Sequence, residues 1–189
     1  MPTLYTAERC PYAARARIVL AEKGLAYDAV EIDLDDRPGW LYEKNPLGRV
    51  PVYEEDEGLV LPESRVIMEY LEERYPEPAL LPPDAAERAL VRLQLERFDT
   101  VLGDAYYAFR RGDEDGAERL AHCLSLIERN AGRWADRYTL AEIAYVPWLI
   151  RLHDLLGFDL SPYPSVADQL ERLSTRPAIA AEREAVAAL

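Results

Sequence analysis

Short apolar runs alternate with a helical pattern over the first third of the chain. The run Thr3–Thr6 predicts a strand, and Ala14 and Ile18 then recur at helical spacing until Gly24, which favours a helix end. The stretch Tyr27–Leu34 predicts a second strand. Because a strand–helix–strand crossover of this length is right-handed, we expect the two strands to be parallel neighbours.

A hairpin is predicted next. Residues 37–48 form a short connection, irregular or helical, that ends in a turn-forming Asn-Pro-Leu-Gly cluster. The apolar runs Val50–Tyr53 and Gly58–Leu61 flank an acidic segment and predict two antiparallel strands. Pro51 has no N–H for a sheet, so it must lie at a strand start or edge, and the Val50–Pro51 bond is a candidate for the cis form.

A helix and a proline-rich segment close this first part. Val66–Leu71 has the spacing of an amphipathic helix, which we expect to end near Tyr75. Residues 76–83 contain four of the fourteen prolines and cannot continue that helix. We therefore predict a first domain over residues 1–76, a linker over 77–83 and a second domain over 84–189.

The second part begins with two predicted helices. An apolar stripe from Val91 to Phe109 predicts one long helix, which the stretch Arg111–Asp113 ends. A second stripe predicts another helix, and the cysteine within it is interpreted as a small core residue. This stripe consists of Leu120, Cys123, Leu124, Ile127, Ala131 and Trp134.

Three further helices complete the chain. Thr139–Glu142 has the form of a capping box, a hydroxyl three residues ahead of a carboxylate, before a long apolar run. Pro147 lies inside that run and is expected to kink or locally break the helix. Two shorter helical patterns follow, at Ser165–Leu173 and Ala178–Leu189.

Composition narrows the class of protein. The chain has 189 residues, 49% apolar and 30% charged, as an ordinary globular protein has. We find no leading signal segment and no apolar run near eighteen residues, so neither secretion nor membrane spanning is expected. The two cysteines are far apart and make no disulfide framework, which favours a reducing cytoplasm.

The charge is acidic and unevenly placed. A net charge of −13 disfavours direct nucleic-acid binding, which needs a basic face. Residues 1–50 hold seven Lys/Arg and eight Asp/Glu, a net of −1, so the rest of the chain carries −12. An anionic small molecule is thus repelled least by the first fifty residues, although each arginine taken singly is equally well explained as a solvated one. These arginines are Arg9, Arg15, Arg17, Arg37 and Arg49.

Cys10 lies where the first predicted strand gives way to the first predicted helix. With Pro11 opening that helix, its sulfur would lie beside unsatisfied N–H groups and the positive end of the helix dipole, which favour the thiolate. The alternative is a buried cysteine acting as a small hydrophobe. Ala13 stands where a Cys-x-x-Cys pair would place its second cysteine, so any exchange chemistry must use one thiol.

Four segments, taken in order and spacing, carry a resemblance to known proteins: Cys10–Ala13, Asn45–Pro51, Glu63–Leu71 and Thr139–Glu142. They resemble the cytosolic glutathione S-transferases, and the cysteine motif resembles the omega-type members. The resemblance implies an α/β thioredoxin-like N-terminal domain (βαβαββα) followed by an all-α helical domain, with glutathione as co-substrate and no metal.

A second resemblance points to a different function. Arg17–Gly24, Glu63–Leu71 and Pro147 with Arg151-Leu152 are similar to the stringent starvation protein A group, which shares the fold but acts by binding RNA polymerase. The chain departs from that group by keeping Cys10. The sequence therefore leaves two hypotheses open, a glutathione-dependent enzyme and a polymerase-binding regulator, with a glutathione-dependent isomerase as a third.

The family resemblance implies a glutathione site. Val50 would offer its backbone N–H and C=O to the extended tripeptide. Ser64, at a helix start, suits the γ-glutamyl carboxylate, Glu63 would face the γ-glutamyl amine, and Arg37 matches the position of a basic residue for the glycyl carboxylate. Capping is the alternative role for Glu63 and Ser64. Cys10 would either take up a glutathionyl group or stabilise the thiolate of glutathione.

The same resemblance implies a pocket for an unidentified second substrate between the domains. Tyr106, Tyr107 and Trp148 are candidates for its wall, and core packing explains each of them equally well. Members of the family are usually homodimers, so we expect a dimer on that ground alone.

Overall fold

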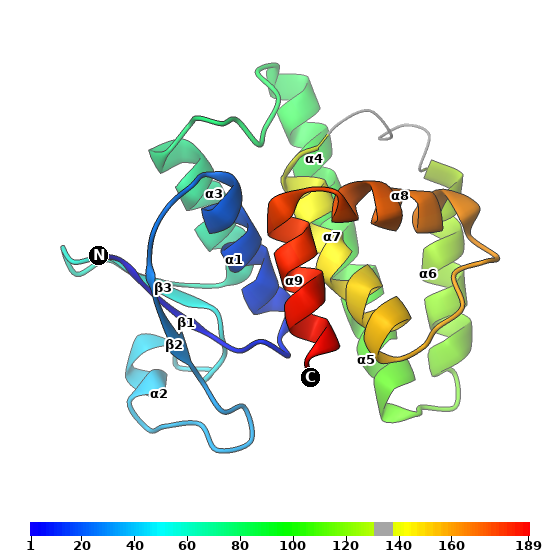
Figure 1. Cartoon of the computed structure of the whole chain (residues 1–189), viewed down its shortest axis with the longest axis horizontal. Helices are drawn as coiled ribbons and strands as arrows, with labels where there is room; N and C mark the ends of the chain where they lie inside the picture. Colours follow the sequence, from blue (N-terminus) through cyan, green and yellow to red (C-terminus); the bar gives the residue numbers. More distant parts are fainter. Residues whose placement is uncertain (131–137) are drawn as a thin grey trace. The chain divides into compact units, whose positions relative to one another are not determined.

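The computed structural model describes residues 1–130 and 138–189. Contacts between residues divide the chain into two compact units, Met1–Leu80 and Leu81–Leu189 (Figure 1). The division falls inside the proline-rich segment 77–83, whereas the domain limits 1–76 and 84–189 stay predictions.

A four-stranded sheet organises the first unit. Its strands are β1 (Thr3–Thr6), β2 (Asp28–Glu31), β3 (Val52–Glu54) and β4 (Val60–Pro62), in the order β2-β1-β3-β4. Strands β1 and β2 are parallel, and β3 pairs antiparallel with both β1 and β4. The predicted crossover and hairpin are therefore confirmed.

Strand β2 is shorter than the predicted stretch Tyr27–Leu34. The Asp33 carboxylate accepts a hydrogen bond from the backbone N–H of Asp35 at 2.8 Å, which is the geometry of an Asx turn. This local bond competes with strand pairing, so the chain leaves the sheet after Glu31.

Three helices accompany the sheet: α1 (Pro11–Glu22), α2 (Leu41–Lys44) and α3 (Ser64–Arg74). Figure 1 shows α1 beside α3, with α2 on the other side of the strands. Lys23 caps the end of α1 and Gly24 follows with a φ of +64°, as the sequence predicts. The connection before the hairpin is helical for the single turn of α2.

The buried face of α3 differs from the predicted stripe. Ile67, Met68 and Leu71 are fully buried, but Val66 is 51% exposed. Val66 precedes Ile67 by about 100° around the helix, which turns its side chain away from the core when Ile67 and Leu71 face inward. The helix itself ends at Arg74, as expected.

The second unit consists of helices. In chain order they are α4 (Ala85–Arg97), η1 (Phe98–Leu102), α5 (Gly103–Arg111), α6 (Gly116–Asn130), α7 (Leu140–Ile150), η3 (Arg151–Leu155), α8 (Pro164–Ser174) and α9 (Pro177–Ala187). The two short patterns predicted near the end of the chain are confirmed as α8 and α9. None of the described helices is both long and apolar enough to cross a membrane.

The long helix predicted over Val91–Phe109 is continuous but not uniform. Its middle, η1, is a π-helical turn, and the Thr100 hydroxyl donates there to the carbonyl of Glu96 at 2.9 Å. Such back-bonding competes with the regular ladder and bends helices. Gly112, with a φ of +75°, ends the helix at the predicted break.

Helix α7 begins with the predicted capping box and then runs through Pro147. Thr139 accepts from the backbone N–H of Ala141, and the Glu142 carboxylate accepts from the backbone N–H of Thr139 at 2.7 Å. Of the two outcomes expected at Pro147, the local break is wrong, because the helix continues to Ile150, and the kink stays a prediction. All eleven of its residues are buried, and that packing offsets the missing hydrogen bond.

Helix α6 carries the second predicted stripe. Leu120, Cys123 and Leu124 are buried, and burial raises the pKa of the Cys123 thiol, as the core interpretation requires. Two members of the predicted stripe, Ala131 and Trp134, lie outside the described residues.

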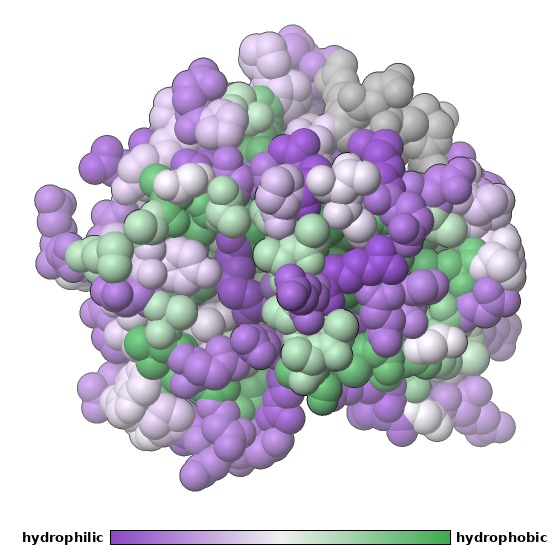
Figure 2. Space-filling view, in the orientation of Figure 1, coloured by the Kyte–Doolittle hydropathy of each residue, from purple (hydrophilic) through white to green (hydrophobic). Residues whose placement is uncertain are grey.

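Polar and charged groups cover most of the face drawn in Figure 2, with smaller apolar patches between them.

Candidate functional site

Cys10 is the N-cap residue of α1. Its backbone is extended, its N–H donates to the carbonyl of Ala7 at 2.9 Å, and Pro11 is the first helical residue. The Arg17 guanidinium fixes the preceding turn by donating to the Thr6 hydroxyl at 2.6 Å and to the Ala7 carbonyl at 3.1 Å. The structure therefore confirms the predicted position of Cys10 at the start of the first helix.

The surroundings of the Cys10 sulfur are mostly apolar. The residue is 9% exposed and belongs to a buried apolar cluster, whose other members are Ala7, Ala13, Ile32, Leu41, Val50 and Val52. Its S–H donates to the Val50 carbonyl, with the sulfur 3.7 Å from the oxygen. The burial alternative thus describes the packing of this thiol, and its reactivity stays a prediction.

The segment before Val50 is shaped by a turn that needs glycine. Asn45 donates from its amide to the Arg49 carbonyl at 2.9 Å and accepts from the Leu47 N–H at 3.1 Å. Gly48 has a φ of +59°, and a Cβ there would lie 2.5 Å from the Tyr42 ring. This turn delivers Val50 to the Cys10 thiol, with the Val50–Pro51 bond in the cis form.

Glu63 and Ser64 begin α3. Glu63 has a φ of +73°, its side chain makes no capping hydrogen bond, and it is exposed. A positive φ at a residue with a side chain is strained, and such strain concentrates at functional sites. Ser64 is the first helical residue and is buried. Because the Glu63 side chain makes no capping hydrogen bond, the capping alternative receives no support for Glu63.

Arg15 contacts Ser64, a connection that the sequence analysis missed. The Arg15 Nη1 donates to the Ser64 hydroxyl at 3.3 Å, and Arg15 is only 1% exposed. Its spacing in the sequence was the available signal. Ile18 follows Arg15 by three residues, so the two side chains share the buried face of α1. A cation in an apolar stripe indicates a specific partner.

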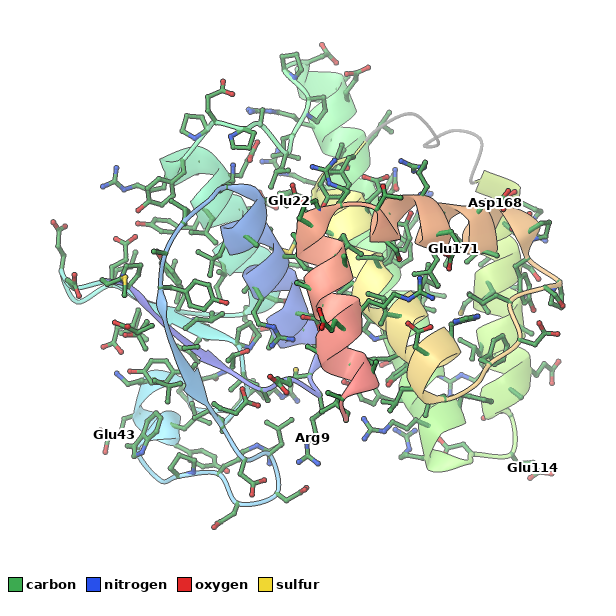
Figure 3. All side chains as sticks on the ribbon, viewed as in Figure 1. Arg9, Glu22, Glu43, Glu114, Asp168 and Glu171 are labelled. Carbon is green, nitrogen blue, oxygen red and sulfur yellow. The ribbon has the colours of Figure 1, made fainter. Side chains whose placement is uncertain are left out.

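Arg37 is exposed on the loop between β2 and α2. Within the part of the chain that the structure describes, no hydrogen bond or ion pair joins it to Cys10, Val50 or Ser64. Arg9, which is labelled in Figure 3, lies next to Cys10 in the chain. It ties this loop to the Cys10 turn, because its guanidinium lies 2.8 Å from the Asp35 carboxylate. The structure therefore brings Cys10 into contact with Val50, and Arg15 into contact with Ser64. Among the described residues, Arg37 does not join either pair.

The aromatic candidates for a second-substrate pocket belong to the second unit. Tyr106 on α5 and Trp148 on α7 are buried, and the Tyr106 ring meets the half-buried Tyr107 edge to face at 5.1 Å. Burial of this kind is what core packing produces, and their role in a pocket stays a prediction.

A separate groove lies on the first unit, between α2 and the sheet. It has a volume of about 620 Å³ and is lined by Tyr5, Val30, Trp40, Glu43, Lys44 and Val60. The Tyr5 hydroxyl and the Lys44 ammonium both donate to the Glu54 carboxylate at 2.6 Å, which lowers the pKa of that carboxyl. None of the predicted site residues lines this groove.

The described residues contain no group of three or more His, Cys, Asp or Glu placed to hold a metal ion. The chemistry that the site offers is that of one thiol, the backbone carbonyl of Val50 that this thiol contacts, and one helix start.

Known proteins resemble both the first unit and the whole chain. Residues 4–79 match the family described as the glutathione S-transferase N-terminal domain. Pyrimidodiazepine synthase of Drosophila melanogaster is 36% identical to the chain, over 94% of this chain and 79% of that protein. Glutathione S-transferase omega-1 of Mus musculus is 42% identical, over 80% of this chain and 67% of that protein. A solved glutathione transferase of Methylococcus capsulatus str. Bath covers all of both chains with a TM-score of 0.88 and 28% identity.

Proposed function

The chain belongs to the cytosolic glutathione S-transferase superfamily and is omega-like, and from this premise we propose that it transfers glutathionyl groups between thiols through Cys10. It is an enzyme with a glutathione-dependent activity, as its relatives are. Its cysteine at the start of α1 favours thiol transfer over conjugation, because a cysteine sulfur itself exchanges with disulfides.

The reaction proceeds in two exchanges. The Cys10 thiolate attacks the glutathionyl sulfur of a mixed disulfide, the S–S bond breaks, and the other thiol leaves as its thiolate. The thiolate of a second glutathione then attacks the glutathionyl sulfur on Cys10. Glutathione disulfide departs and Cys10 is regenerated as a thiolate. In total one glutathione has reduced one mixed disulfide, and the other half of the glutathione disulfide comes from the substrate.

The observation that carries this proposal is the contact between Cys10 and Val50. The sulfur lies 3.7 Å from the Val50 carbonyl oxygen, beside a backbone segment that precedes β3. An extended peptide that pairs with the Val50 backbone would present its own sulfur next to the Cys10 thiol. A backbone N–H of the bound peptide would also donate to the Val50 carbonyl in place of the Cys10 S–H. The thiol would then no longer be held as a hydrogen-bond donor, which favours loss of its proton.

The remaining glutathione contacts follow the family pattern. Ser64, at the start of an eleven-residue helix, suits the γ-glutamyl carboxylate, since N–H groups and the helix dipole both favour an anion. Glu63 is exposed at that helix start and is assigned to the γ-glutamyl amine. Arg37 is assigned to the glycyl carboxylate and would have to reach it from the exposed loop before α2.

Three further features are proposed from the family. Tyr106, Tyr107 and Trp148 are assigned to a second-substrate pocket, the protein is assigned to the cytoplasm, and its functional form is assigned as a homodimer. The polymerase-binding alternative and the isomerase alternative are not favoured by any specific observation on the described residues.

The test is a thiol-exchange assay on a glutathionylated peptide with glutathione as reductant. We expect Cys10→Ser to abolish enzyme-catalysed release of the peptide thiol, because serine cannot form the mixed disulfide. Cys123→Ser serves as the matched control, since Cys123 is buried in the other unit and should leave the rate unchanged.

Circular dichroism of both variants checks that the fold is intact. Wild-type protein that shows no exchange above the uncatalysed rate, or a Cys10→Ser variant that keeps the full rate, would contradict the proposal.

A further inference from the structure

Arg15 is a buried cation next to the proposed glutathione site. Its guanidinium is 1% exposed, stacks over the Tyr12 ring at 5.1 Å and donates to the Ser64 hydroxyl at 3.3 Å. Arginine stays protonated in proteins, so this donor is permanent. The contact joins the N-terminal half of α1, which Cys10 precedes as the N-cap residue, to the first residue of α3.

The contact fixes what the Ser64 hydroxyl can do. A hydroxyl has one hydrogen to donate and two lone pairs to accept with. Because arginine has no acceptor, Ser64 must accept from Arg15, and its own O–H is left to donate in another direction. A hydroxyl held in this way is oriented as a donor before a ligand arrives, which suits a carboxylate.

The charge on Arg15 acts in the same direction. Two helices start here, α1 with twelve residues and α3 with eleven, and the N-terminal end of each is positive. A guanidinium shielded from water is screened little by salt, so its field adds to these dipoles. The combination favours an anion at the start of α3.

We propose that Arg15 is a positioning residue that orients the Ser64 hydroxyl and makes the site selective for thiols that carry a γ-glutamyl carboxylate. This inference rests on the proposed function and names the part of glutathione that Arg15 selects. As a positioning residue, Arg15 should act on binding and leave the exchange step at Cys10 unchanged.

A merely structural cation would behave differently. If Arg15 only joined α1 to α3, its loss would weaken the fold and lower activity equally with every thiol. A positioning residue changes the discrimination between thiols. Glutathione and cysteinylglycine separate the two cases, because cysteinylglycine has the reacting sulfur and the glycyl carboxylate but lacks the γ-glutamyl group.

The test measures kcat and KM of thiol exchange for both thiols with Arg15→Met and Arg15→Lys. We expect Arg15→Met to raise the KM for glutathione about tenfold, equivalent to about 1.4 kcal/mol. Its kcat for glutathione and its KM for cysteinylglycine should stay within about twofold of the wild-type values. Arg15→Lys keeps the charge but not the planar fork, so its KM for glutathione should lie between the two.

A matched control is Lys23→Met, which removes another buried cation, at the C-terminal end of α1. Lys23 pairs with Glu72 at 2.7 Å and lies about 12 Å along the axis from Arg15. Its loss should lower stability without changing the ratio of the two KM values. Ser64→Ala in the Arg15→Met background should add little to the loss, because both changes remove one contact.

An equal loss with both thiols, or an unchanged KM for glutathione, would overturn the role of Arg15 while the proposed function stands. If Arg15→Met fails to fold, the glutathione and cysteinylglycine constants of Arg15→Lys decide the matter in the same way. Wild-type protein that does not use glutathione at all would instead refute the proposed function.

Discussion

At the scale of single residues, the site depends on where the backbone carries Cys10, Val50 and Ser64. Pro11 and the Arg17 contacts with the preceding turn place Cys10, and the Asn45–Gly48 turn places Val50. These placements follow from residues with restricted backbones or fixed partners. Changes in those supporting residues should therefore reach the site although they touch no substrate.

Gly48→Ala is the first such change. A Cβ at this position would lie 2.5 Å from the Tyr42 ring, in a backbone of φ +59° that alanine rarely adopts. We expect the free energy of unfolding to fall by about 1 to 2 kcal/mol. The KM for glutathione should rise several-fold as Val50 shifts, measured by urea unfolding and by thiol exchange.

Gly58→Ala provides the matched control for this change. Gly58 has a φ of +88° in the hairpin turn, and a Cβ there would meet nothing within 4 Å. It should lose similar stability with an unchanged KM. A raised KM in both variants, or in neither, would argue against a specific role for the Gly48 turn.

At the scale of elements, α7 holds a carboxyl group in an unusual place. Burial raises the pKa of Glu142, although the hydroxyl and backbone N–H of Thr139 donate to it. A raised pKa means that the folded state binds the proton more tightly than the unfolded state. Stability is therefore fully present below the unfolded pKa of about 4.5 and is lost as the pH rises through the folded pKa.

Glu142→Gln should remove this pH dependence. We expect the stability of the wild type relative to Glu142→Gln to fall as the pH is raised above about 4.5, and then to level off. Urea midpoints of the two proteins across this pH range give the measurement. If the wild type instead gains stability relative to Glu142→Gln as the pH rises, the capping hydrogen bonds outweigh burial at this carboxyl.

Local rules predicted most of the elements but not their irregularities. The parallel crossover, the hairpin, the capping box and the glycine helix ends are short-range patterns, and the structure confirms them. The π-helical turn at η1 and the unbroken passage of α7 through Pro147 depend on packing by distant residues. The exposed Val66 depends on the helix rotation that packing against α1 selects.

The same limit applies to the site. The position of Cys10 at a helix start follows from its neighbours in sequence, and so does the start of α3 at Ser64. The Arg15–Ser64 contact joins residues 49 apart, and the apolar packing around the Cys10 sulfur draws on five segments. Sequence patterns describe one segment at a time. They leave burial of Cys10 open as an alternative, but they predict neither its neighbours nor the Arg15–Ser64 contact.

At the scale of the whole molecule, the proposed homodimer gives an apolar face of the second unit a role. Leu90, Leu93 and Val101 are exposed and lie near one face of the α4–η1 stretch. Clustered exposed apolar side chains indicate an interaction surface. We expect Leu93→Glu to shift the protein toward monomer in sedimentation velocity at micromolar concentration.

Leu155→Glu is a suitable control, since Leu155 is similarly exposed on η3 and not on this face. Its sedimentation should match that of the wild type. Equal dissociation by both variants, or a wild-type protein that is already monomeric, would count against an assembly through α4.

The central claim, that Cys10 itself accepts the glutathionyl group, is tested most directly by the intact mass of the protein. The protein is mixed briefly with a glutathionylated peptide, quenched in acid and analysed by mass spectrometry with peptide mapping. The account predicts one added glutathionyl group, located on Cys10, lost on addition of glutathione and absent from Cys10→Ser. An unmodified Cys10 in protein that turns over the same peptide would contradict it.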